Sequence, residues 1–93
     1  MIISFACKET EKIWIGLQSR KFPASIQERA LVKLGWIDAS NLAQDLRVPP
    51  SNHLEALKGN RKGQMSIRIN NQWRICFEFE GGNAYEVEIV DYH

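Results

Sequence analysis

The last three residues of the chain carry side chains that can hold or transfer a proton. Asp91, Tyr92 and His93 supply a carboxylate, a phenol and an imidazole, one after another. Chain termini are also the places where disorder concentrates, and catalysis seldom depends on them. The sequence therefore leaves two interpretations open, a working site at the end of a strand or a polar tail without a function.

Cations precede this terminus and would complete a site for cleaving RNA without a metal. Residues 54–76 carry five Lys or Arg and one Glu, whereas residues 77–93 carry five Asp or Glu and neither Lys nor Arg. Such cleavage needs fixed cations for the charge that develops on the phosphate, and groups that move protons at the 2′-OH and the 5′-oxygen. Arginine suits the first task because its fork binds two phosphate oxygens at once. The candidate cations are Lys58, Arg61, Arg68 and Arg74.

Each of these candidates also has a purely structural interpretation. Arg68 and Arg74 stand on strands that face glutamates, and this pattern by itself favours cross-strand ion pairs. Tyr92 could cover an edge of the core with its ring buried and its hydroxyl in water. From the residue pattern alone, a ribonuclease is one option among several.

Length and composition limit the kinds of protein to which the chain can belong. A chain of 93 residues, 44% hydrophobic and 25% charged, predicts one globular domain that spans residues 1–93. We expect a cytoplasmic location, because the start has no secretory signal and no apolar run approaches the roughly 20 residues that span a membrane. Cys7 and Cys76 are too few and too far apart for a disulfide framework or a zinc site, so we expect no metal and no cofactor.

The first half of the chain predicts a strand and two helices. Met1 to Phe5 is apolar enough for a short edge strand, and Lys8 to Leu17 has the spacing of a helix with Ile13 and Leu17 on one face. A second helix should begin with Pro23 in its first turn and close between Asp38 and Asn41. Its core-facing stripe would comprise Ile26, Ala30, Leu34 and Ile37.

The last thirty residues change to a period of two, which predicts strands after a loop from His53 to Gly63. Three alternating runs are separated by hairpin turns at residues 70–71 and 81–83. The fold class is therefore α+β, with an N-terminal strand, two packed helices and a three-stranded antiparallel meander. One sheet face should pack on the helices and the other should face solvent. The expected core-facing residues of the last run are Tyr85, Val87 and Ile89. The expected residues of the solvent face are Arg68, Arg74, Glu86, Glu88 and Tyr92.

Two stretches, LEALKGNRKGQMSIRINNQWRICFEF and the terminal VEIVDYH, resemble the HigB branch of the RelE/ParE toxin superfamily, and within it the GraT-like members. These proteins are the toxins of bacterial type II toxin–antitoxin systems. The series ALKGNR, SIRIN, QWRI and DYH is specific in combination, although each piece alone is weak. The resemblance extends over the whole chain and implies a RelE-like fold.

The resemblance also implies an activity and a set of roles. Members of the family cleave mRNA in the ribosomal A site without a metal. The motif places phosphate-stabilising cations at Lys58 and Arg74, groups that transfer protons or orient the nucleotide at Tyr92 and His93, and a binding role at Asp91. Arg68 and Arg61 would add phosphate contacts. The implied partners are the ribosome with its mRNA and a helix-turn-helix antitoxin similar to HigA.

The sequence departs from some relatives at two positions. Glu55 stands where some relatives have a histidine, and Gln72 stands where some have an asparagine before Trp-Arg. The missing histidine removes one candidate proton donor. A toxin that binds a protein without cutting RNA, as gyrase inhibitors with this fold do, and a plain RNA- or ribosome-binding module remain the alternatives.

Overall fold

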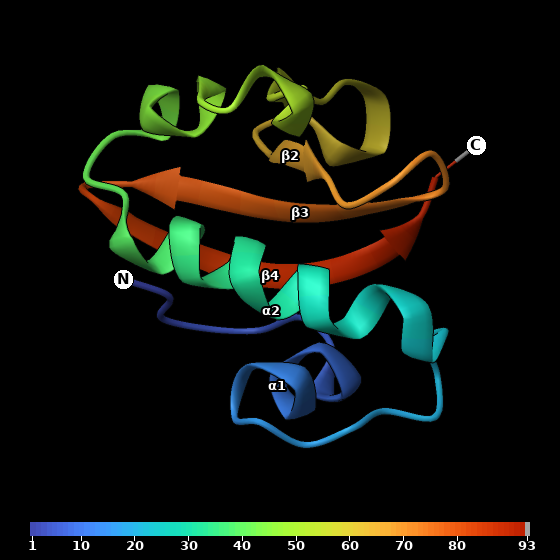
Figure 1. Cartoon of the computed structure of the whole chain (residues 1–93). Helices are drawn as coiled ribbons and strands as arrows, with labels where there is room; N and C mark the ends of the chain where they lie inside the picture. Colours follow the sequence, from blue (N-terminus) through green and yellow to red (C-terminus); the bar gives the residue numbers. More distant parts are fainter. Residues whose placement is uncertain (93) are drawn as a thin grey trace.

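The architecture is α+β, with two helices followed by a four-stranded antiparallel sheet (Figure 1). The structure is a computed structural model and describes residues 1–92. The helices are α1 (Lys8–Trp14) and α2 (Ala24–Ala39), and the strands are β1 (Glu55–Ala56), β2 (Met65–Arg68), β3 (Trp73–Glu80) and β4 (Asn83–Asp91). Two short 3₁₀ turns, η1 (Ala43–Arg47) and η2 (Pro50–Asn52), connect α2 to β1, and a third, η3 (Gly59–Arg61), lies between β1 and β2. None of the helices in residues 1–92 is long and apolar enough to cross a membrane.

The second helix follows its predicted stripe, whereas the first ends earlier than predicted. Ile26, Ala30, Leu34 and Ile37 are all buried. Pro23 caps α2 from outside instead of occupying its first turn. Helix α1 ends at Trp14, and Gly16 then turns the chain with a φ of 94°. The prediction that this helix extends to Leu17 is therefore wrong, and Leu17 is 57% exposed.

The sheet differs from the predicted meander at both of its edges. Its order is β1-β2-β3-β4, and the short β1 pairs with Met65 and Ser66 at the start of β2. A strand of two residues inside a loop has no period that a sequence could show. The predicted N-terminal strand is not formed, because residues 1–6 make only two isolated parallel bridges to β4, from Ile2 to Ala84 and from Phe5 to Val87.

A β-bulge in β4 interrupts its pairing with β3 and explains a second error, which concerns the residue predicted to be buried at the start of β4. Cys76 pairs with Glu88 and Glu78 pairs with Tyr85, so β4 has one extra residue between these pairs. Glu86 lies in this bulge with a φ of 53°, and its N–H donates to Ser4 Oγ instead of to a backbone carbonyl. Ala84 therefore takes the buried place that was predicted for Tyr85, which is half-buried. Val87 and Ile89 beyond the bulge are buried as predicted.

The bulge predicts a gain in stability from one surface substitution. A left-handed backbone costs an ordinary residue about 1–2 kcal/mol, and glycine avoids this cost. Glu86→Gly should therefore raise the free energy of unfolding by about 1 kcal/mol, measured by urea denaturation. Glu86→Val should lower it by about 1 kcal/mol, because β-branched residues avoid this conformation. Equal stability of the two variants would contradict the bulge geometry.

The sheet face opposite the helices is not open to solvent, contrary to the prediction. Ser66 and Cys76 are fully buried and Arg74 is only 8% exposed. Residues 53–61 lie over this face, because His53 and Glu55 contact Arg74 and the side chain of Arg61 reaches Glu88 on β4. Leu57 in this segment is buried and Leu54 packs against the core. Any site on this face is consequently a partly covered depression.

Candidate active site

Arg74 lies at the centre of the candidate site and is fixed by the segment that covers it. Its Nε donates to Ser66 Oγ at 2.8 Å, and its Nη2 donates to the His53 carbonyl at 2.5 Å and to the Ser66 carbonyl at 3.3 Å. A carboxylate oxygen of Glu55 lies 3.7 Å from the same Nη2. Among residues 1–92, the hydrogen bonds of the guanidinium come from Nε and Nη2 and none comes from Nη1, and the side chain is 10% exposed.

Tyr92 packs on Arg74, and the backbone around it is held in place. The guanidinium carbon of Arg74 lies 5.5 Å from the centre of the Tyr92 ring, within cation–π range. The Tyr92 N–H donates to the Gln72 carbonyl at 2.6 Å, which extends the pairing of β3 and β4 beyond Asp91. The ring stays 45% exposed. As far as Tyr92, therefore, the chain end is an ordered extension of β4 and not a frayed tail.

A small depression beside Tyr92 brings together three of the predicted residues. It has a volume of about 320 Å³ and is lined by Glu55, Ala56, Leu57, Lys58, Arg61 and Tyr92. Lys58 is exposed at its rim, at the start of η3. Arg61 forms an ion pair with Glu88 at 2.8 Å, and this hydrogen bond raises the pKa of Arg61 above its ordinary value. Lys58 is thus the more accessible of the two cations.

The structure does not bring all the predicted residues into this depression. Asp91 pairs with Trp73 in the β3–β4 ladder, and its carboxylate accepts a hydrogen bond from Gln72 Nε2 at 3.1 Å. Arg68 is the ladder partner of Arg74, but its side chain donates to the Asn70 carbonyl and lines a different groove. His93 lies outside the described residues.

The sequence did not identify the groups that fix Arg74. Ser66 pairs with Cys76 in the ladder and lies on the same face as Arg74, so its period-two position was a usable signal. The contacts from His53 and Glu55 depend on how the loop folds over the sheet, and no local pattern indicates that. Cys76 also lies on this face, and burial raises the pKa of its thiol, which disfavours a role as nucleophile. Among residues 1–92, no three His, Cys, Asp or Glu side chains cluster as metal ligands would.

The fold places the chain in a structural class. It is similar to a chain of the solved YoeB–YefM complex from Staphylococcus aureus, with a TM-score of 0.57 and 18% identity, covering 100% of this chain and 95% of the other. Residues 4–93 match the family described as RelE-like toxin of type II toxin-antitoxin system HigB. The chain therefore belongs to the HigB-like family of RelE-type toxins, as the sequence motifs predicted.

Two relatives are informative about this family. Over 65 residues the chain is 45% identical to Toxin HigB-1 of Vibrio cholerae serotype O1, a match that covers 70% of this chain and 68% of the relative. Over 40 residues it is 48% identical to Endoribonuclease HigB of Proteus vulgaris, covering 43% of this chain and 44% of the relative. A toxin of a type II system implies a cognate antitoxin as its partner.

Proposed function

We propose that this toxin is an endoribonuclease that cleaves mRNA on the ribosome, without a metal, by attack of a ribose 2′-OH on the adjacent phosphorus. The observation that carries the proposal is the stack of Tyr92 on the fixed guanidinium of Arg74, with Tyr92 and Lys58 lining the same depression. A cation that is fixed before the reaction stabilises developing charge without any cost of reorganisation. Four contacts with its surroundings fix Arg74 in this way.

In the proposed reaction, Arg74 and Lys58 bind the scissile phosphate and stabilise its charge. The 2′-oxygen loses its proton and bonds to phosphorus, while the bond from phosphorus to the 5′-oxygen breaks and that oxygen takes up a proton. The products are a 2′,3′-cyclic phosphate and a 5′-hydroxyl. Tyr92 orients the nucleotide over Arg74, and His93 transfers protons. Arg61, Arg68 and Asp91 would contribute to positioning the RNA from the surroundings.

Two alternatives assign no chemistry to the site, namely a toxin that binds a protein such as gyrase and a module that only binds RNA or ribosomes. Neither function needs a guanidinium that is fixed by hydrogen bonds and packed against an aromatic ring. We therefore prefer the ribonuclease, and we expect the ribosome to place the mRNA at the depression and a helix-turn-helix antitoxin similar to HigA to inhibit it.

Expression of the chain without its antitoxin tests the proposal in cells. Growth should stop, and primer extension on abundant transcripts should show new 5′ ends within translated codons. The same transcripts with a mutated start codon should remain intact, because cleavage needs the ribosome. Growth arrest with intact mRNA would contradict the nuclease and favour a protein target.

A further inference from the structure

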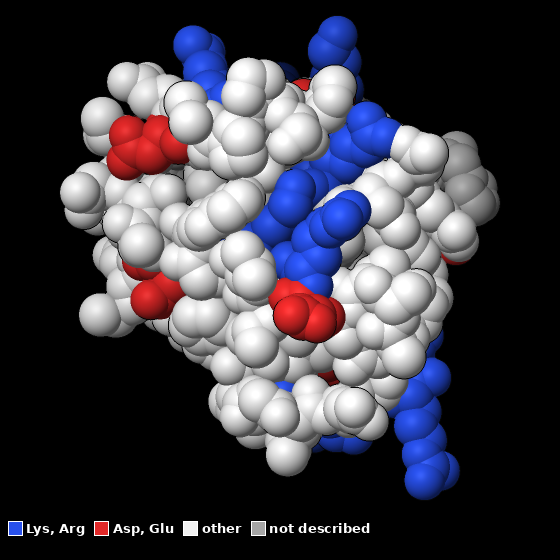
Figure 2. Space-filling model, viewed as in Figure 1, with Lys and Arg blue, Asp and Glu red and all other residues white. Residues whose placement is uncertain are grey.

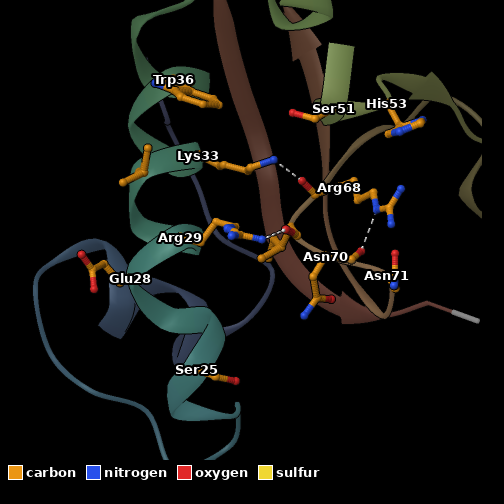
Figure 3. A pocket seen from close by; sticks show the side chains of 12 residues that line it. Ser25, Glu28, Arg29, Lys33, Trp36, Ser51, His53, Arg68, Asn70 and Asn71 are labelled. Atoms are coloured by element: carbon orange, nitrogen blue, oxygen red, sulfur yellow. Dashed lines mark hydrogen bonds between the residues drawn. The ribbon is translucent and has the colours of Figure 1, made fainter. Parts of the chain in front are cut away.

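A second and larger groove lies beside the candidate active site, and of the residues that line it only Arg68 and His53 have a role in the function proposed above. It has a volume of about 950 Å³ and lies between α2, the η2 turn and the β2–β3 turn (Figure 3). The side chains that line it include Arg29, Lys33, Trp36, Arg68, Asn70 and Asn71. Figure 2 shows Lys and Arg side chains gathered over the middle of this face of the molecule.

The cations of this groove have no carboxylate partner. Lys33 is only 6% exposed and donates to Asn52 Oδ1 at 2.9 Å and to the Arg68 carbonyl at 2.5 Å. Within the described chain, no carboxylate lies within 4.0 Å of a charged nitrogen of Arg29, Lys33 or Arg68. Glu28 is the one acidic residue among those that line the groove. The groove is therefore built to attract an anion.

The cations of this groove lie close enough together to affect the pKa of Lys33. Burial lowers its pKa, and the positive charges of Arg29, Arg68 and Arg74 lower it further. The fold thus maintains four neighbouring cations that repel one another, and an anionic ligand would relieve this repulsion.

An aromatic ring and two amides add features that a simple anion would not need. Trp36 is 39% exposed on α2 and its side chain points into the groove (Figure 3). The side-chain amides of Asn70 and Asn71 lie on the opposite wall. Proteins that bind single-stranded nucleic acid combine cations that contact the backbone with aromatic rings on which bases stack.

The groove adjoins the candidate active site at the free edge of β2. Strand β1 pairs only with Met65 and Ser66, so Ile67 and Arg68 have no partner strand on that side. Arg68 and Arg74 are ladder partners, and the Cα atoms of residues paired across neighbouring strands lie about 5 Å apart. His53 joins the two sites, because its side chain lines the groove while its carbonyl accepts a hydrogen bond from Arg74.

From this geometry we propose that the groove is a binding subsite for the single-stranded RNA that flanks the cleaved bond, with phosphates on Arg29 and Arg68 and a base stacked on Trp36. The subsite rests on the proposed function, since it extends the path of the RNA away from Arg74. An acidic peptide would satisfy the cations, but it would use neither the continuity with Arg74 nor the stacking surface of Trp36.

Anisotropy with a fluorescein-labelled, fully 2′-O-methylated RNA of about ten nucleotides tests the subsite, because this probe binds but cannot be cleaved. The double variant Arg29→Ala/Arg68→Ala should bind at least tenfold more weakly than the unmodified full-length chain. The slope of log Kd against log salt should fall by about 1.4, the value for two phosphate contacts on a single strand. Arg20→Ala removes an exposed arginine elsewhere and should bind as the unmodified chain does.

Trp36 provides a second pair of variants. Trp36→Ala should weaken binding about tenfold, the loss expected for one stacked base, whereas Trp36→Phe should stay within about threefold. Thermal unfolding by circular dichroism establishes that each variant is folded before its affinity is compared.

Three outcomes would overturn the subsite: no binding of the probe by the unmodified chain, equal affinity of the double variant and the Arg20→Ala control, or tighter binding of a deca-glutamate peptide at the same groove. The last result would assign the groove to an acidic protein segment. Failure of the proposed function looks different, because the probe would then bind as predicted while the chain cleaves no mRNA on ribosomes.

Discussion

Replacement of Arg74 by alanine should lower the rate of mRNA cleavage on ribosomes at least 100-fold. The loss of one fixed donor to a developing oxyanion typically costs about 10²–10³ in rate. Arg74 is such a donor in our proposal, because Ser66 and the His53 carbonyl fix its guanidinium through Nε and Nη2. The measurement is single-turnover cleavage of a defined mRNA by the purified chain, at a temperature well below the unfolding transition.

Two comparisons separate this loss from unfolding. Arg74→Ala leaves buried acceptors without a donor, so its free energy of unfolding should fall by about 1–3 kcal/mol, which urea denaturation measures. Arg74→Lys keeps the charge but lacks the fork, and should fold while still losing most of the activity. Arg20→Ala should cleave normally. If folded Arg74→Lys or Arg74→Ala cleaves at the unmodified rate, the assignment of Arg74 is wrong.

Replacement of His93 by alanine should lower cleavage about 100-fold, the lower end of the range for a general acid or base. We assign the proton transfer to His93, because the Tyr92 ring packs on Arg74 and is placed to orient the nucleotide. Single-turnover cleavage of the defined mRNA measures this loss, with Arg20→Ala as the control.

Tyr92 supplies the matched comparison. Tyr92→Phe keeps the ring on Arg74 and should lose less than tenfold, whereas Tyr92→Ala removes the ring and should lose more than Tyr92→Phe does. If Tyr92→Phe is as slow as His93→Ala, the phenol moves the proton and the roles must be exchanged. These outcomes decide between the two groups that the sequence left open.

The sequence predicted the elements of the fold that have a regular period. The stripe from Ile26 to Ile37 is buried, and the alternation of β2 and β3 gives the correct core-facing residues. The errors fall where the period is broken by geometry. Because of the bulge at Glu86, Ala84 is buried in place of Tyr85. The two-residue β1 forms only because the loop folds back onto β2.

The candidate site was predicted in the same uneven way. Parity placed Tyr92 on the same face as Arg74, and the bulge does not disturb this because it precedes Val87. The covering of Arg74 by residues 53–56 and the groove at Trp36 involve contacts between distant segments. Local sequence patterns do not contain such contacts, so neither could be derived before the structure.

The nature of the RNA ends is the most direct test of the proposed mechanism. Ribosomes that carry a defined mRNA are incubated with the chain, and the fragments are analysed by mass spectrometry. We predict a 2′,3′-cyclic phosphate on one fragment and a 5′-hydroxyl on the other, and no cleavage when the nucleotide before the scissile bond is 2′-deoxy. A 3′-hydroxyl with a 5′-phosphate, or cleavage of the 2′-deoxy mRNA at the same bond, would contradict attack by the 2′-OH.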